Sequence, residues 1–173
     1  ICGICFFGLG QFNESIASYK HALKLQPDCV EVHFNLGNSY QTMGEFESAI
    51  TSYKQVLRIH PSYDKAYFNL GIIYTDLAQP DLAILNYKQA LRINPNYSEA
   101  HNNLGTVLVG LDKLTEAIKH YEIALKIKPS LIELHLLLAD LYKATEKFEL
   151  AITSYSKALE LDPGCAEIHY TLG

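Results

Sequence analysis

The sequence predicts an all-α protein, an α-solenoid of stacked antiparallel helix pairs, and three observations support this prediction. Five of the six prolines recur every 34 residues, at Pro27, Pro61, Pro95, Pro129 and Pro163. Three apolar columns keep the same interval: Ile16, Ile50, Ile84, Ile118 and Ile152; Tyr19, Tyr53, Tyr87, Tyr121 and Tyr155; Leu23, Leu57, Leu91, Leu125 and Leu159. Within one interval, apolar residues follow one another three or four positions apart, which is the spacing of one helix face. A repeat of this length buries its apolar face by stacking on its neighbours.

The first helix of each interval is illustrated by "VHFNLGNSY", where Val32, Leu36 and Tyr40 share one face. The segment "TMGEF" follows, and Gly44 is of the residue type that ends helices in a left-handed conformation. Glu47 falls in the first turn of the next helix, where a negative charge is favoured by the helix dipole. The pattern therefore predicts a helix, a short turn and the start of a second helix.

The second helix carries Ile50, Tyr53 and Leu57 on one face. Pro61 predicts its end, because the residue before a proline avoids the helical region. Pro80 stands where a second helix should begin, and a proline costs little there because first-turn N–H groups have no helical acceptor. Each interval therefore predicts a helix pair followed by a turn marked by proline.

The interval divides residues 1–173 into one array of repeats. We predict a truncated unit at 1–29, complete units at 30–63, 64–97, 98–131 and 132–165, and the start of a further unit at 166–173. The chain begins without methionine and stops inside the pattern, so we interpret it as part of a longer protein.

Composition narrows the class of protein. About half of the residues are hydrophobic (49%), and 19% are charged, as in a folded protein. The net charge of −5 disfavours nucleic acid as a partner, because nucleic acid selects a basic surface. No apolar run reaches the roughly 18–20 residues that cross a bilayer, and "ICGICFFGLG" lacks the basic start of a signal peptide. We therefore expect no membrane partner and a cytoplasmic location, with the nucleus left open.

The repeat resembles the tetratricopeptide repeat (TPR) along essentially the whole chain. In one unit the resemblance lies in His33, Leu36, Gly37, Tyr40, Ala49, Tyr53 and Pro61. It implies a right-handed superhelix whose first helices line a concave groove, and this groove usually holds an extended peptide or a partner helix. We therefore expect the partner to be a protein or peptide segment.

Asn35, Asn69 and Asn103 form a column 34 residues apart on the predicted first helices. A carboxamide both donates and accepts hydrogen bonds, so the column could hold the backbone of an extended chain. It is similar to the asparagine ladder in the repeats of O-linked N-acetylglucosamine transferase, and it is interrupted at Leu137. The alternative is that these asparagines bond to neighbouring helices and fix the angle between units.

Other residues are assigned to the concave groove by their place in the repeat. They are Phe34, Asn38, Phe68, Ile72, Asn102, Leu136 and Asp140. Aromatic and aliphatic side chains in a groove are expected to supply specificity. Family members that bind the C-terminal carboxylate of chaperones use lysine and arginine on the first helices. This sequence has Phe34, Asn38, Asn69, Glu99 and Asn103 at the corresponding places, so we do not expect it to bind such a carboxylate.

The sequence contains no convincing catalytic or metal-binding set. The repeat places Cys2 and Cys5 of "CGIC" inside a first helix, where we expect small core residues rather than a redox or zinc pair. His33, His101 and His135 share a column, but packed helices separate equivalent positions by about 8–10 Å, too far for one ion. We interpret them as partly buried aromatic substitutes, and we expect no cofactor and no enzyme activity in this segment.

The sequence therefore predicts a non-catalytic protein–protein interaction segment of a larger protein. One alternative is the substrate-recruiting region of a glycosyltransferase similar to O-linked N-acetylglucosamine transferase, with its catalytic domain outside this chain. Another is a purely architectural scaffold. Because the terminal repeats lack one neighbour, we also expect either fraying at both ends or self-association through their exposed faces.

Overall fold

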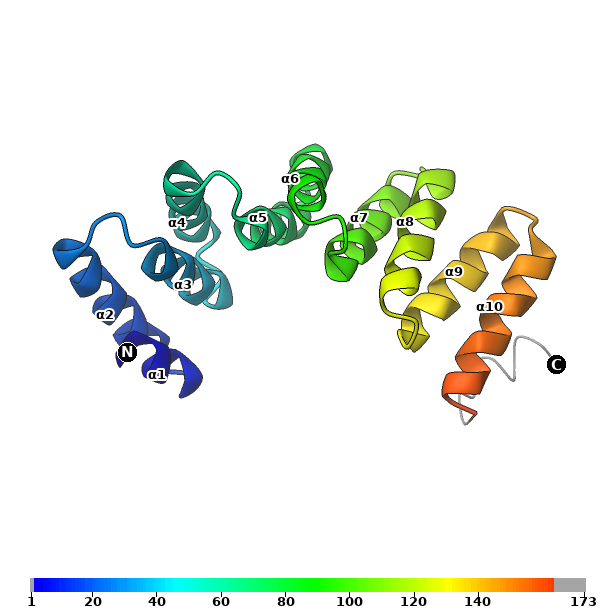
Figure 1. The fold of residues 1–173 in the computed structure, drawn as a ribbon, viewed down its shortest axis with the longest axis horizontal. Helices are drawn as coiled ribbons and strands as arrows, with labels where there is room; N and C mark the ends of the chain where they lie inside the picture. Colours follow the sequence, from blue (N-terminus) through cyan, green and yellow to red (C-terminus); the bar gives the residue numbers. More distant parts are fainter. Residues whose placement is uncertain (1, 164–173) are drawn as a thin grey trace. The chain divides into compact units, whose positions relative to one another are not determined.

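The computed structural model describes residues 2–163, and in that range the only regular elements are ten α-helices (Figure 1). They are α1 (Cys2–Gly8), α2 (Phe12–Leu25), α3 (Val30–Thr42), α4 (Phe46–Ile59), α5 (Asp64–Asp76), α6 (Pro80–Ile93), α7 (Ser98–Gly110), α8 (Leu114–Ile127), α9 (Ile132–Ala144) and α10 (Phe148–Leu161). Successive helices pack in pairs, α3 with α4, α5 with α6, α7 with α8 and α9 with α10. The predicted all-α class is confirmed. None of the described helices combines the length and apolarity needed to cross a bilayer.

The chain forms two compact units, Ile1–Asn94 (unit 1) and Pro95–Gly173 (unit 2). In unit 1, α2 packs against α3 and α4 packs against α5, so each helix pair is covered by the next. In unit 2, α8 packs against α9 in the same way. Contacts inside each unit therefore follow the nearest-neighbour pattern of a repeat protein.

Large tyrosines face small residues in the core of each helix pair. Tyr53 of α4 is fully buried, and its ring lies against Gly37 of α3. A Cβ atom at Gly37 would lie 2.6 Å from Cε1 of Tyr53, closer than van der Waals contact allows. Gly71 and Gly105 face Tyr87 and Tyr121 in the same way. The glycine column therefore makes room for the tyrosine column.

The turns between the two helices of a pair require a left-handed backbone. Gly44 adopts it with φ +75° after α3, as the sequence predicted. Ala78, Asp112 and Glu146 adopt it in the later turns, with φ of 52°, 57° and 59°. A side chain makes this conformation less favourable than it is for glycine.

We expect Ala78→Gly to raise the free energy of unfolding by about 0.5–1 kcal/mol, because it relieves the left-handed alanine. Urea denaturation followed by circular dichroism would measure the change. Gly44→Ala is the matched control and should lower stability by a similar amount. Equal midpoints for all three proteins would contradict this explanation of the turns.

The expectation that both cysteines of "CGIC" are core residues is wrong for Cys5, which is exposed on α1. The equivalent Ser39 of α3 is fully buried and lies 3.2 Å, Oγ to Oγ, from Ser15 of the preceding α2. No described helix precedes α1, so the same position is open there. The side chain of Cys2, together with Cys165, His169 and the predicted helix from 166, lies outside the described residues.

Candidate functional site

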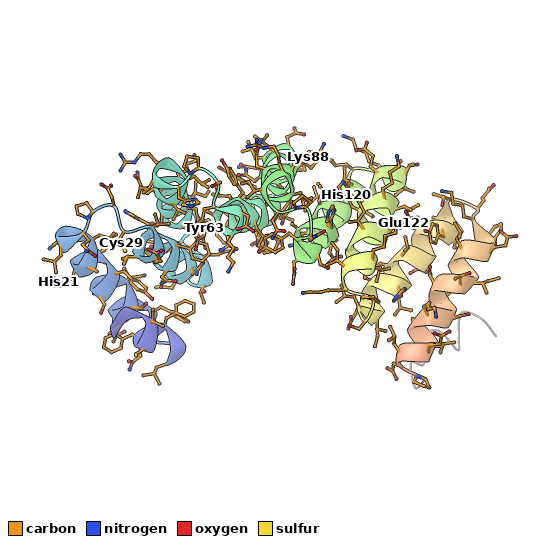
Figure 2. All side chains as sticks on the ribbon, viewed as in Figure 1. His21, Cys29, Tyr63, Lys88, His120 and Glu122 are labelled. Atoms are coloured by element: carbon orange, nitrogen blue, oxygen red, sulfur yellow. The ribbon has the colours of Figure 1, made fainter. Side chains whose placement is uncertain are left out.

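The predicted binding residues of unit 1 lie on α3 and α5, the first helices of two neighbouring pairs. We call this set the first-helix face of unit 1, and it comprises Phe34, Asn35, Asn38, Phe68, Asn69 and Ile72. All six side chains are half-buried, so each combines internal contacts with some access to solvent. Figure 2 shows the side chains on the ribbon.

Asn69 links its own helix to the preceding helix pair. Its Nδ2 lies 3.0 Å from Oδ1 of Asn38 on α3 and 3.0 Å from the hydroxyl of Tyr53 on α4. The Tyr53 hydroxyl lies 2.7 Å from Oδ1 of Asn38 and 2.8 Å from Oε1 of Gln41, so its single proton can be donated to either acceptor. The amide donors of Asn69 are therefore used in bracing. Its Oδ1 makes no hydrogen bond with another described residue of unit 1.

The Tyr53 hydroxyl is the centre of this network. Burial raises the pKa of Tyr53, and the hydrogen bond from Asn69 lowers it in part, so the phenol stays neutral. The 34-residue periodicity marks Tyr53 only as a core residue and does not reveal this role. The available signal was that a buried tyrosine hydroxyl needs a partner, and Asn38 and Gln41 stand three residues apart on the helix it faces.

The other two asparagines of the column differ from Asn69. Asn35 on α3 and Asn103 on α7 are half-buried, and neither carboxamide makes a hydrogen bond with a described residue of its own unit. The backbone carbonyl of Asn35 accepts a hydrogen bond from the Ser39 hydroxyl, and this contact does not involve the carboxamide. Within its own unit, each carboxamide therefore has a donor and an acceptor that no described residue uses.

The two predicted phenylalanines rest on tyrosines. The ring of Phe34 lies 5.7 Å from that of Tyr53 and 5.1 Å from that of Tyr63, measured between centroids. The ring of Phe68 lies 6.0 Å from that of Tyr87. These contacts orient the rings, so the exposed part of each is a fixed apolar surface rather than a free side chain.

Unit 2 presents a second, more polar set of predicted residues. Asn102 and Asn103 lie on α7, and Leu136 and Asp140 lie on α9. Oδ1 of Asn102 is buried and has no hydrogen-bond partner among the described residues. Leu136 is half-buried, and Asp140 is exposed while accepting a hydrogen bond from the hydroxyl of Tyr155. Asp140 therefore has an internal structural contact in addition to its predicted binding role.

The histidines of the column make a hydrogen bond with a proline carbonyl that the sequence pattern did not predict. Nε2 of His33 lies 2.7 Å from the carbonyl oxygen of Pro27, and His101 and His135 repeat this contact with Pro95 and Pro129 at 3.1 and 3.0 Å. His33 and His135 are half-buried as predicted, and His101 is buried more completely. Each ring therefore links the first helix of its pair to the turn that precedes this helix.

His101 also contacts a second histidine. Its Nδ1 lies 2.9 Å from Nδ1 of His120 on α8. The Pro95 carbonyl can only accept, so neutral His101 carries its proton on Nε2, and Nδ1 is left to accept from His120. This arrangement leaves His101 no free position for a second proton.

We expect the stability of unit 2 to fall as the pH drops below 7. Burial lowers the pKa of His101, and its bond to Pro95 raises it only in part. An unfolded histidine titrates near pH 6.5, so the unfolded chain takes up the proton first. Urea midpoints at pH 7.5 and 5.5 should therefore differ less in His101→Tyr than in the original chain. Exchange of the exposed His21 for Asn should leave the difference unchanged, and an unaltered difference in His101→Tyr would contradict the explanation.

Comparison with sequence families identifies the repeat. A family model described as "TPR repeat" matches residues 5–44, 42–77 and 139–173, more than half of the chain. Two models described as "Tetratricopeptide repeat" match residues 64–97 and 86–119. The chain belongs to the tetratricopeptide repeat family. Members of this family generally act as non-catalytic modules of protein–protein interaction.

Solved structures share the fold over nearly the whole chain. MamA is 28% identical with a TM-score of 0.87, and the match covers 96% of this chain and 98% of that one. MamA from Desulfovibrio magneticus RS-1 is 20% identical with a TM-score of 0.83, covering 95% and 93%. YrrB is 21% identical with a TM-score of 0.78, covering 98% and 87%. The latter two similarities show the fold alone. No curated protein matches the sequence.

Proposed function

We propose that this TPR chain is a non-catalytic recruiting segment and that the first-helix face of unit 1 binds an extended peptide. The observation that carries this proposal is the unengaged carboxamide of Asn35 beside the fixed ring of Phe34. The carboxamide can donate to and accept from a peptide backbone, while the ring supplies an apolar contact.

The braced part of the face supports the proposal because it is preorganised. Asn38, Tyr53 and Asn69 hold α3 and α5 together without using Oδ1 of Asn69. A peptide would therefore meet side chains that are already ordered, which lowers the entropic cost of binding. YrrB, which shares the fold, is described as a TPR protein with an unusual peptide-binding site.

A second peptide contact is proposed on unit 2, through Asn102, Asn103, Leu136 and Asp140. The half-buried carboxamide of Asn103, which makes no hydrogen bond with a described residue of unit 2, favours a ligand that offers a backbone N–H and C=O. We propose that the repeats form one array within a longer cytoplasmic protein, with the unit boundaries predicted above.

The glycosyltransferase-arm alternative is favoured by one observation, namely that the carboxamides of Asn35 and Asn103 have no hydrogen bond inside their own units. An asparagine ladder that recruits substrates needs such free groups. The scaffold alternative is favoured by Asn69, whose amide donors are engaged within the protein.

A peptide-array screen, combined with thermal melting, distinguishes asparagines that bind a peptide from asparagines that connect neighbouring helices. Asn35→Ala should reduce peptide capture without changing the melting temperature, because its carboxamide has no internal hydrogen bond in unit 1. Asn69→Ala is the matched variant and should lower the melting temperature, because it removes two internal hydrogen bonds. Unchanged capture by Asn35→Ala together with Asn103→Ala would overturn the peptide ladder and favour an architectural role.

A further inference from the structure

An aromatic cluster stands at one end of the first-helix face of unit 1. The ring of Tyr63, which precedes α5, lies 5.1 Å from the ring of Phe34 and 5.8 Å from the ring of His60. Phe34 in turn contacts the buried Tyr53. We call Phe34, His60 and Tyr63 the aromatic corner; His60 is exposed, and the other two are half-buried. The corner therefore continues the proposed peptide surface into the turn between α4 and α5, where Figure 2 labels Tyr63.

Two carboxylates flank the aromatic corner. Glu31 lies in the first turn of α3, and Asp64 lies in the first turn of α5. Asp64 follows Tyr63 directly, and Glu31 stands three residues before Phe34 on α3, on the same side of that helix. Burial, and then the negative charges of Glu31 and Asp64, raise the pKa of Tyr63. Helix N-termini explain why acidic residues stand at these positions. The helix N-termini do not, however, supply a cationic side chain that pairs with Glu31 or Asp64.

The described part of the chain supplies no cation to this corner. Neither Glu31 nor Asp64 takes part in an ion pair there; Asp64 accepts hydrogen bonds only from the Lys65 backbone and from Asn94. Arg58 pairs instead with Asp28. On unit 2, by contrast, Lys128 pairs with Glu99 and lowers its pKa. The aromatic corner is therefore flanked by two carboxylates that have no ion-pair partner in the described part of the chain.

Elsewhere the chain places its own lysines over tyrosine rings. Nζ of Lys20 lies 5.5 Å from the ring centroid of Tyr40, and Nζ of Lys147 lies 6.0 Å from that of Tyr142. In residues 2–163 no lysine or arginine lies over Phe34 or Tyr63 in this way. A cation is attracted to the face of an aromatic ring, and a carboxylate beside the ring adds a charged hydrogen bond.

We propose that the aromatic corner is a subsite for a cationic side chain, arginine or lysine, of the peptide bound by unit 1. This inference rests on the proposed peptide-binding function and adds the chemistry of one partner residue. Glu31 is the main carboxylate for the cation, because it is exposed and accepts one long hydrogen bond, from Sγ of Cys29 at 3.7 Å, whereas Asp64 accepts two shorter internal hydrogen bonds. Arginine should be preferred, since its planar group can stack on a ring while it donates to a carboxylate.

The test is a selection from a random decapeptide library by the whole chain at pH 8, where histidine side chains are neutral. Arginine or lysine should be enriched at one position of the retained peptides. Replacing an arginine at that position with citrulline, which keeps its shape and removes the charge, or a lysine with uncharged Nε-acetyllysine, should weaken binding about five- to tenfold. Glu31→Gln should remove the enrichment, and Glu133→Gln, the equivalent exposed change in unit 2, should preserve it.

The outcomes separate this subsite from peptide binding itself. The subsite would be overturned if the retained peptides show no preferred cationic residue, or if such a preference persists in Glu31→Gln. Either result would leave the proposed peptide-binding function intact. If no peptide is retained, the proposed function fails, and Nα-acetylarginine methylamide then tests the corner alone. Shifts of the Phe34 and Tyr63 ring signals in its NMR titration, weaker with the citrulline analogue, would support the subsite; an absence of shifts would overturn it.

Discussion

Replacing Tyr53 with alanine should lower the free energy of unfolding of unit 1 by about 3–5 kcal/mol. The side chain is fully buried, fills the space left by Gly37, and supports the ring of Phe34. Its removal creates a cavity and also breaks the network that joins α3 to α5 through Asn69. Because repeat proteins are stabilised by nearest-neighbour contacts, the loss should spread to both adjoining helix pairs.

Urea denaturation and amide hydrogen exchange of α3, α4 and α5 would measure this effect. Tyr53→Phe is the control that keeps the ring and removes only the hydroxyl, and it should cost about 0.5–1.5 kcal/mol. A loss in Tyr53→Ala no larger than that in Tyr53→Phe would mean that the hydroxyl network, rather than packing, dominates at this position. Peptide binding to the first-helix face should fall in Tyr53→Ala, since Phe34 loses its support.

The helices and their pairing could be predicted because they depend on the periodicity of side-chain types. Gly44 and Pro80 marked a helix end and a helix start, and the structure places them there. The residue type of Ala78 carries no sign of its left-handed conformation, and only its place 34 residues after Gly44 could have indicated it. The division between Asn94 and Pro95 was equally hidden, since the 34-residue pattern continues across it without a change in composition.

The sequence predicted which positions of the candidate site are equivalent in successive repeats, but not the contacts that each side chain makes. Spacing placed Asn35 and Asn69 at equivalent positions, but it could not say that their side chains behave differently. One difference is the residue 31 positions earlier, which is Asn38 for Asn69 and Ile4 for Asn35, whereas a tyrosine stands 16 positions earlier in both cases. An acceptor is present in the first case, and a hydrocarbon side chain stands in the second. The same column therefore contains one brace and at least one unengaged carboxamide.

Two glycines of α7 allow the steric role of the glycine column to be measured directly. A Cβ at Gly105 would lie 2.4 Å from Cε1 of the fully packed Tyr121, whereas a Cβ at Gly110 would meet nothing within 4 Å. Both substitutions to alanine gain helix propensity of up to about 1 kcal/mol. Gly105→Ala should nevertheless lose about 1–3 kcal/mol in total, because the buried tyrosine must move.

Thermal and urea unfolding of the two variants should therefore shift in opposite directions, with Gly110→Ala unchanged or slightly more stable. The repeat at 132–165 accommodates a side chain at this position, since Ala139 is the equivalent of Gly105. The hydroxyl of Tyr155, the equivalent of Tyr121, donates a hydrogen bond to Asp140 there. In α7 the hydroxyl of Tyr121 lies 3.0 Å from that of Thr106, and a moved ring would lose this contact. A Gly105→Ala protein as stable as Gly110→Ala would mean that Tyr121 can adopt the position its counterpart takes in the last pair. In that case, glycine at this position would not be required for the tyrosine ring to pack between the two helices.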